Sequence, residues 1–138
     1  MSELSIAPIR DEDVPEVIAL WERCGLTRPW NDPHRDIALA RETPTSEVLV
    51  GWLDGCIAAS AMVGSDGHRA YAYYVAVEPE AQGRGLGRAV MQAAEDWAKA
   101  RGCPKFHVLV RKANEAVMGF YEALGFTADE TVLMGKRY

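Results

Sequence analysis

Three glycines alternate with larger residues in the stretch Gln-Gly-Arg-Gly-Leu-Gly-Arg at 82–88, between a strand-like run and a helix-like run. Glycine tolerates positive φ angles and lets the backbone approach a ligand closely. The first N–H groups of a helix have no partner within that helix, so they point outward and favour an anion. The pattern therefore indicates a nest of backbone N–H groups that binds an anion, most often a phosphate.

Three kinds of phosphate-binding loop compete for this stretch. A P-loop needs Gly-x-x-x-x-Gly-Lys and then serine or threonine, and no Gly-Lys-Ser/Thr follows Gly83 or Gly85. A Rossmann fingerprint needs its third glycine one position later and an acidic residue about twenty positions further on, but the region 103–105 is not acidic. The third pattern, Gln/Arg-x-x-Gly-x-Gly/Ala, fits residues 82–87 at every position.

Hydrophobic periodicity and turn residues predict the elements that must position this loop. Strands are expected at 4–10, 47–53, 56–64, 70–77, 105–111 and 130–137. Helices are expected at about 13–24, 32–41, 86–102 and 114–124. Asp54-Gly55 fits a type I′ hairpin turn, and the strand-helix-strand run from 70 to 111 forms a βαβ unit with parallel strands. The prediction is a mixed α/β fold: a central, mostly antiparallel sheet with one parallel βαβ step and helices on both faces.

Length, charge and cysteine usage limit the function classes. The chain has 138 residues, and this length suits one domain spanning 1–138. A formal net charge of -5 argues against a nucleic-acid scaffold, which needs a basic face. No run of about eighteen apolar residues and no signal-like N-terminus occurs, so neither a membrane span nor export is expected. Cys24, Cys56 and Cys103 form no CxxC or Cys/His cluster, which favours reduced thiols in a cytoplasmic protein without a metal site.

The glycine loop follows Tyr-Val-Ala-Val-Glu-Pro-Glu-Ala at 74–81 and precedes Asn114 and the run Phe-Tyr-Glu-Ala-Leu-Gly-Phe at 120–126. With these motifs in this order, nearly the whole chain resembles the GNAT superfamily of acyl-CoA-dependent N-acyltransferases. The segments 20–33 and 133–137 are also similar to small bacterial acetyltransferases of the YpeA type. The resemblance implies a GNAT-like fold and acetyl-CoA as cosubstrate, with no metal.

The resemblance assigns roles to individual residues. The backbone N–H groups of 82–88 would cradle the pyrophosphate of coenzyme A, and strand 73–77 would pair with the pantetheine arm. The N–H of Val75 or a neighbour would polarise the thioester carbonyl. Asn114 would bind the pantetheine arm, and Tyr121 would lie near the sulfur as general acid. The expected cofactor-binding set is Val75, Ala76, Val77, Gln82, Gly83, Arg84, Gly85, Leu86, Gly87, Arg88, Asn114 and Tyr121.

Each of these residues has a plainer interpretation that the sequence leaves open. Asn114 could simply cap a helix, and Tyr121 shares an apolar stripe with Val117 and Leu124 that is typical of a core. The general base is not assigned, because Tyr71 stands where histone-type relatives carry a strand glutamate. Other conceivable bases are Glu22, Asp32, Asp66 and His68, and ordered water could also take the proton, while Asp32 is expected to cap a helix. Glu78 follows the strand and is expected to face solvent rather than act as a base. Candidates for the acceptor side are Arg28, Trp30 and Asn31.

The function expected from the resemblance is transfer of an acetyl group from acetyl-CoA to a primary amine of a small molecule or peptide. The amine would attack directly in a ternary complex, because no residue is placed to carry a covalent acyl group. The alternative is a domain of the same fold that binds acyl-CoA as a sensor or interaction module without turnover. A homodimer is possible, whereas nucleic acid and membrane are not expected partners.

Overall fold

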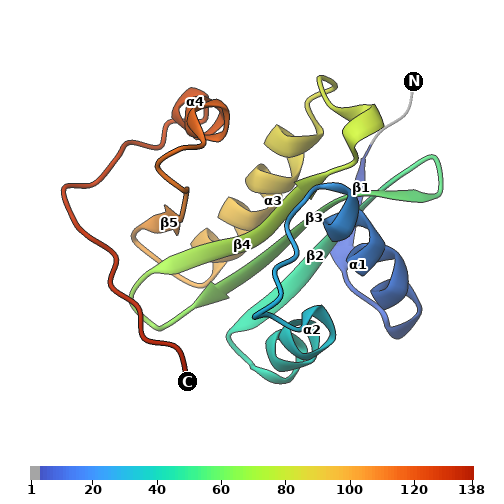
Figure 1. The fold of residues 1–138 in the computed structure, drawn as a ribbon, viewed down its shortest axis with the longest axis horizontal. Helices are drawn as coiled ribbons and strands as arrows, with labels where there is room; N and C mark the ends of the chain where they lie inside the picture. Colours follow the sequence, from blue (N-terminus) through green and yellow to red (C-terminus); the bar gives the residue numbers. More distant parts are fainter. Residues whose placement is uncertain (1–3) are drawn as a thin grey trace.

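A five-stranded sheet organises residues 4–138, the part of the chain that the computed structural model describes (Figure 1). Its strands lie in chain order: β1 (Ser5–Pro8), β2 (Ser46–Leu53), β3 (Cys56–Ser65), β4 (Ala70–Val77) and β5 (Phe106–Val108). Neighbours from β1 to β4 are antiparallel, and β4 and β5 are parallel. The predicted mixed α/β class, with a mostly antiparallel sheet and one parallel step, is confirmed.

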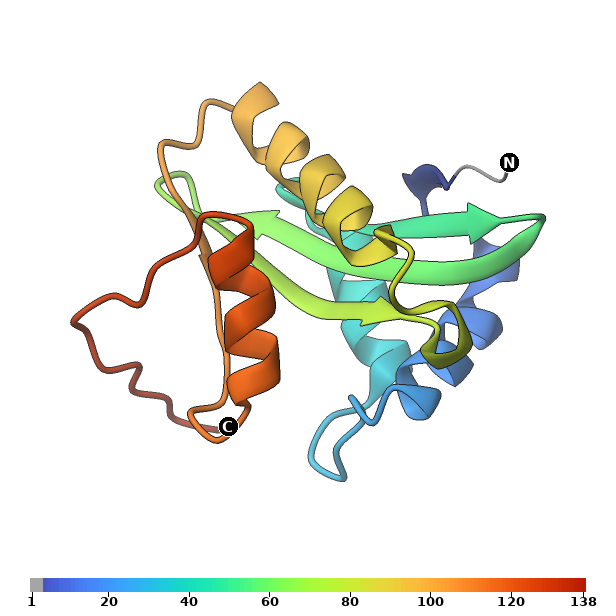
Figure 2. The ribbon, with the colours of Figure 1, turned by 90° about the horizontal axis from the view of Figure 1, so that it is seen from above.

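Helices cover both faces of this sheet. Helices α1 (Val14–Arg23) and α2 (Pro33–Glu42) lie on one side, and α3 (Leu86–Ala100) lies on the other (Figure 2). Helix α4 (Glu115–Ala123) packs beside α3 and β4. Alternate side chains of β2 enter the two layers, since Val48 and Val50 join the α1/α2 cluster while Leu49 packs in the α3 cluster.

A β-bulge interrupts β4 at Tyr74. Ser60 of β3 pairs with Ala76, and Met62 pairs with Tyr73, so β4 carries an extra residue in this interval. Tyr74 adopts a φ of 50°, a left-handed conformation that is uncommon outside glycine. Bulges bend a strand and redirect its side chains, and they are frequent beside active sites.

A buried chain of hydrogen bonds fixes this bulge. The indole N–H of Trp21 donates to Oγ of Ser60 at 2.8 Å, and the Ser60 hydroxyl donates to the carbonyl of Tyr74 at 2.9 Å. The ring of Trp21 also stacks on that of Tyr74, with centroids 3.8 Å apart. Trp21 and Ser60 are both fully buried. The side chain of Tyr74 therefore has a defined direction before any ligand binds.

We expect Ser60→Ala to lower the free energy of unfolding by about 1–3 kcal/mol, because the buried Trp21 indole would lose its acceptor. Urea denaturation followed by circular dichroism measures the change. Thr127→Ala, at an exposed position after α4, is the control and should stay within about 0.5 kcal/mol of the parent. Parental stability of the Ser60 variant would contradict this account of the bulge.

Strand β4 pairs with β5 only through its first three residues, whereas β5 is paired along its whole length. The paired residues are Ala70 with Phe106, Tyr71 with His107 and Ala72 with Val108. Beyond Ala72, β4 and the chain that follows β5 run apart, as Figure 2 shows. The outer edge of β4 from Tyr73 to Val77 therefore has no strand partner among the described residues.

The strand predicted at 130–137 is wrong. The chain after α4 forms neither helix nor strand, and Val132, Leu133 and Met134 are 83%, 76% and 88% exposed (Figure 1). Strand β5 is also shorter than the predicted 105–111, so its edge offers few groups for a further strand to pair with. Asp129 instead binds Lys105 at 3.0 Å, and the chain then runs on past the α1–α2 loop.

Between residues 4 and 138, the structure contains no helix that is both long enough and apolar enough to span a bilayer.

Candidate active site

The glycine loop leads directly into α3. Gly83 and Gly85 have φ angles of 84° and 78°, and a Cβ atom added to either would meet no atom within 4 Å. Gly85 is the N-cap of α3, and no side chain caps the helix there. The first turn of α3 contains no acidic residue, and the exposed Arg84 and Arg88 flank it. The first N–H groups of α3 thus face open space of positive character, which fits a phosphate.

Gly87 has a different role from the other two glycines. It lies inside α3 without a positive φ, so the sequence-based expectation of conformational freedom does not apply to it. A Cβ atom on Gly87 would lie 3.0 Å from Cζ of Phe120 and 3.5 Å from Cγ2 of Val77. The missing side chain allows the start of α3, the end of β4 and the middle of α4 to meet. Leu86 is buried, so it offers a ligand only its backbone.

Tyr121 lies where α4 packs against the rest of the site. The residue is 8% exposed and packs with Met91 of α3, and half-buried Val75 of β4 borders the same cluster. The hydroxyl makes no hydrogen bond with the described residues, yet among them no fully buried side-chain N or O atom lacks a partner. The hydroxyl oxygen must therefore reach solvent. Burial raises the pKa of Tyr121 to about 12, so at neutral pH the phenol is protonated and available as a donor.

The remaining residues predicted to bind the cofactor lie around these groups. Ala76 is buried, and its neighbours Val75 and Val77 are half-buried, so only the backbone of β4 is presented at the open edge. The carbonyl of Val77 accepts from Nε2 of Gln82 at 3.4 Å. Asn114 caps α4 by accepting from the Val117 N–H at 3.3 Å, which confirms the capping interpretation.

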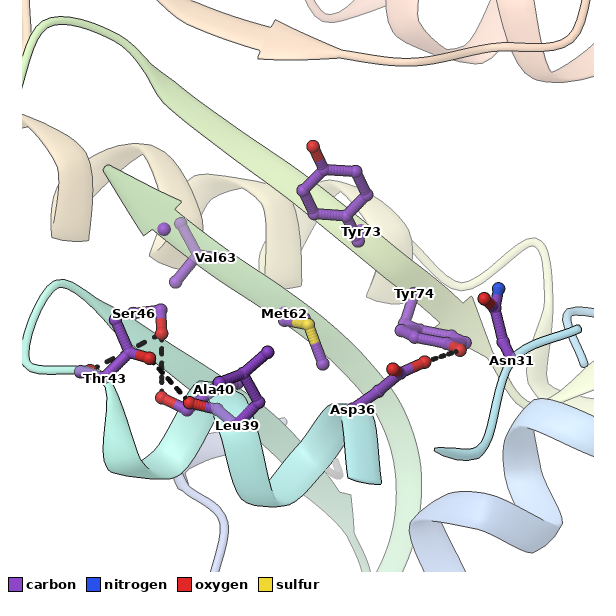
Figure 3. Close-up of a pocket in the computed structure, with 11 residues that line it drawn as sticks. Asn31, Asp36, Leu39, Ala40, Thr43, Ser46, Met62, Val63, Tyr73 and Tyr74 are labelled. Atoms are coloured by element: carbon purple, nitrogen blue, oxygen red, sulfur yellow. Dashed lines mark hydrogen bonds between the residues drawn. The ribbon is translucent and has the colours of Figure 1, made fainter. Parts of the chain in front are cut away.

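A pocket of about 390 Å³ lies on the opposite face of the sheet, between α2 and the strands β3 and β4 (Figure 3). Asp36 is the one charged side chain among the described residues that line it. The Tyr74 hydroxyl donates to Oδ2 of Asp36 at 2.6 Å, and burial together with this hydrogen bond raises the pKa of Tyr74. The polar lining residues are Asn31, Asp36, Thr43, Ser46, Tyr73 and Tyr74.

Sequence reasoning missed Asp36. A carboxylate in the first turn of a helix, just after a proline, is usually explained by the helix dipole. Asp36 occupies such a place in α2, behind the N-cap Asp32 and Pro33. The only local signal was the neighbouring Asn31, a candidate for the acceptor side that does line the pocket.

Three carboxylates considered as bases are committed to other contacts. Glu78 does not face solvent as expected, because Oε2 accepts from Arg23 Nη2 at 2.7 Å and the side chain is 22% exposed. Asp32 caps α2 by accepting from the N–H of His34 at 2.9 Å, as expected. Asp66 accepts from two backbone N–H groups of its turn, which lowers its pKa.

Arg28 and Trp30, the other candidates for the acceptor side in the loop before α2, make different contacts from Asn31. Arg28 donates to the carbonyls of Gly25 and Thr27 at 2.8 Å each, so it closes the loop, and it does not line the pocket between α2 and the strands β3 and β4. Trp30 is 52% exposed, and the guanidinium of Arg137 lies 5.6 Å from its ring centroid. Within residues 4–138, no three His, Cys, Asp or Glu side chains are arranged to hold a metal ion.

Known proteins share this architecture and sequence. Residues 9–126 match the model of the acetyltransferase (GNAT) family. An acetyltransferase of Yersinia pestis is 43% identical over 134 residues, covering 97% of this chain and 95% of that protein, and one of Pectobacterium atrosepticum is 44% identical with the same coverage. A solved aminoglycoside N-acetyltransferase, AAC(6')-Iy in complex with CoA, superposes with a TM-score of 0.85 at 16% identity, covering 99% of this chain and 96% of that one. The chain therefore belongs to the GNAT family of acetyltransferases.

Proposed function

We propose that this protein, as one domain spanning 1–138, transfers an acetyl group from acetyl-CoA to a primary amine of a small molecule or peptide. The observation that carries the proposal is the meeting of the unpaired β4 edge, the uncapped start of α3 and the Tyr121 phenol. These supply an edge for an extended amide chain, a nest for phosphate and a proton donor. The family and the CoA-bound fold neighbour support acetyl-CoA as the donor.

The donor would lie along one line of the structure. The nest at Gly83 and Gly85 would bind the pyrophosphate, and the free edge from Tyr73 to Val77 would pair with the pantetheine amides as an added strand. The Val75 N–H would then donate to the thioester carbonyl and polarise it. Loss of such a donor typically lowers the rate about 10²–10³-fold. Asn114, at the start of α4, would complete the pantetheine contacts.

The chemical step would need no covalent enzyme intermediate. The neutral amine nitrogen attacks the thioester carbon, and the C–S bond breaks as the tetrahedral intermediate collapses. The departing sulfur takes the Tyr121 phenol proton, and the phenolate regains a proton from the nitrogen of the new amide. One N–H proton thus moves to sulfur overall, and Tyr121 is regenerated.

A thiol-release assay with acetyl-CoA and a panel of alkylamines, polyamines, aminoglycosides and peptides tests this function. Aminoglycosides belong in the panel because a fold neighbour carries that activity in its name. We expect at least one amine to release coenzyme A well above the rate of hydrolysis. Thermal stabilisation by acetyl-CoA without thiol release from any amine would instead favour the alternative, a domain that binds acyl-CoA without turnover.

A further inference from the structure

The pocket between α2 and the bulge of β4 has the character of a cation site. Its volume of about 390 Å³ falls in the range of small-ligand pockets, about 300–1,000 Å³. Asp36 supplies one negative charge, and no Lys, Arg or His lines the pocket among the described residues. Leu39, Met62 and Val63 form much of the remaining wall. A ligand with an ammonium group and an aliphatic body complements these surfaces, whereas a carboxylate beside the amine would meet Asp36.

The carboxylate of Asp36 is held in a defined position. Oδ2 accepts the 2.6 Å hydrogen bond from Tyr74, while Oδ1 has no hydrogen-bond partner within residues 4–138 (Figure 3). Tyr74 in turn is fixed by its stacking on Trp21 and by the Ser60 hydrogen bond to its carbonyl. One oxygen is thus anchored, and the other is left to accept from a ligand.

The pocket adjoins the place where the acyl group is expected. Tyr73 and Tyr74 line the pocket and also begin the part of β4 whose outer edge has no strand partner. An amine bound from the α2 side and a thioester held along this edge would approach the same residues of β4 from two sides.

We propose that Asp36 binds the ammonium group of the acceptor and accepts its proton, which makes this pocket selective for alkylamines. The inference rests on the proposed function and names the acceptor subsite of that reaction. One N–H bond of the ammonium breaks, its proton moves to the Asp36 carboxylate, and the nitrogen lone pair becomes available for attack on the thioester carbon. Tyr74 is a positioning residue in this scheme, because it acts through Asp36.

A pair of acceptors with similar shape tests the assignment. An alkylamine is protonated at neutral pH, since its pKa is close to the value of roughly 10.4 for lysine, whereas an arylamine is uncharged and needs no base before attack. For Asp36→Asn we expect kcat/KM to fall about 10²-fold with the alkylamine and to change little with the arylamine. The readout is the ratio of the two kcat/KM values, which a general loss of folding does not alter.

Two further variants complete the experiment. Glu42→Gln removes a carboxylate of the same helix that does not line this pocket, and should leave the ratio at the parental value. Tyr74→Phe removes the hydrogen bond while retaining the ring, and should lower the ratio about tenfold. If Asp36→Asn fails to fold, the Tyr74 variant alone decides the matter.

The outcomes separate this inference from the proposed function. An unchanged ratio in Asp36→Asn, or in Tyr74→Phe where the first variant does not fold, overturns the role of Asp36 while thiol release by the parent upholds acetyl transfer. Absence of thiol release by the parent with every acceptor overturns acetyl transfer itself, and the subsite with it.

Discussion

Replacing Tyr121 with phenylalanine should lower kcat about 10²-fold while the affinity for acetyl-CoA and the melting temperature stay close to the parental values. The ring packs with Met91 and Phe126, and phenylalanine retains those contacts. The hydroxyl makes no hydrogen bond with the described residues, so its removal leaves no partner unsatisfied. The substitution should therefore slow the chemical step and spare folding and binding. The expected decrease in kcat is at the low end of the range for general acid catalysis, because a thiolate is a fair leaving group even without protonation.

Tyr71→Phe is the matched control for this change. Tyr71 is a half-buried tyrosine of β4 whose ring lies 5.3 Å from that of His107, and no role in the reaction is proposed for it. Thiol release under saturating substrates and thermal denaturation measure both variants. Parental kcat in Tyr121→Phe, under conditions limited by chemistry, would show that solvent supplies the proton.

The pH profile gives a second readout of the same residue. Tyr121 acts as a donor only when its phenol is protonated. Burial raises the pKa of this phenol to about 12, so it stays protonated to a higher pH than an ordinary tyrosine. The contribution of the phenol is therefore complete at neutral pH and lost only as the pH rises through about 12. A tyrosine with the usual pKa of roughly 10 would already be half ionised at about pH 10. We expect kcat to show no decline between about pH 8 and about pH 10.

Gly85→Asn should abolish the stabilisation that coenzyme A gives. A ligand at about 100 times its dissociation constant adds about 2.7 kcal/mol to the stability of a protein that binds it only when folded. A β-branched residue would be strained at the φ of 78° that Gly85 adopts, whereas asparagine tolerates this region. A Cβ atom at this position would meet no atom within 4 Å. The new side chain would instead fill the space before the first N–H groups of α3.

The other end of the same helix provides the control. Gly102 has a φ of 77°, and a Cβ atom there also meets nothing within 4 Å, so Gly102→Asn should cost the same in stability. Only the Gly85 variant should lose the rise in melting temperature with coenzyme A. A full rise in Gly85→Asn would place the pyrophosphate elsewhere, and equal losses in both variants would point to stability alone.

Much of this fold could be predicted from the sequence because its turns and the buried faces of its helices are specified by residues within a single segment. Asp54 and Gly55 have φ angles of 54° and 80°, as a type I′ turn requires, and they join β2 to β3. The apolar stripe of α3 became its buried face, with Val90, Ala94 and Trp97 among the buried residues. In each case the signal itself lies within one segment, although the buried face of α3 packs against strand residues that are distant in the sequence.

The predictions that were wrong or missing concern residues whose contacts are made with distant parts of the sequence. Glu78 is bound by Arg23, from 55 positions earlier, and Asp36 meets Tyr74, 38 positions later, because a bulge redirects that side chain. The strand expected at 130–137 needed a long β5 edge that the fold does not supply. No periodicity within a segment reports such pairings.

Helix α2 packs on the sheet through only a few buried residues. It also lies on the other side of the sheet from the elements proposed to bind the donor. Ile37 and Ala40 are its buried residues, while Arg35, Leu39 and Glu42 are exposed. The nest and Tyr121 belong to α3 and α4 on the far face. Leu39 is the exposed residue of this helix that also lines the proposed acceptor pocket. If the proposed site is right, substitutions at Leu39 should change which amine is accepted without disturbing donor binding, so this position is the place to randomise in directed evolution toward a new acceptor.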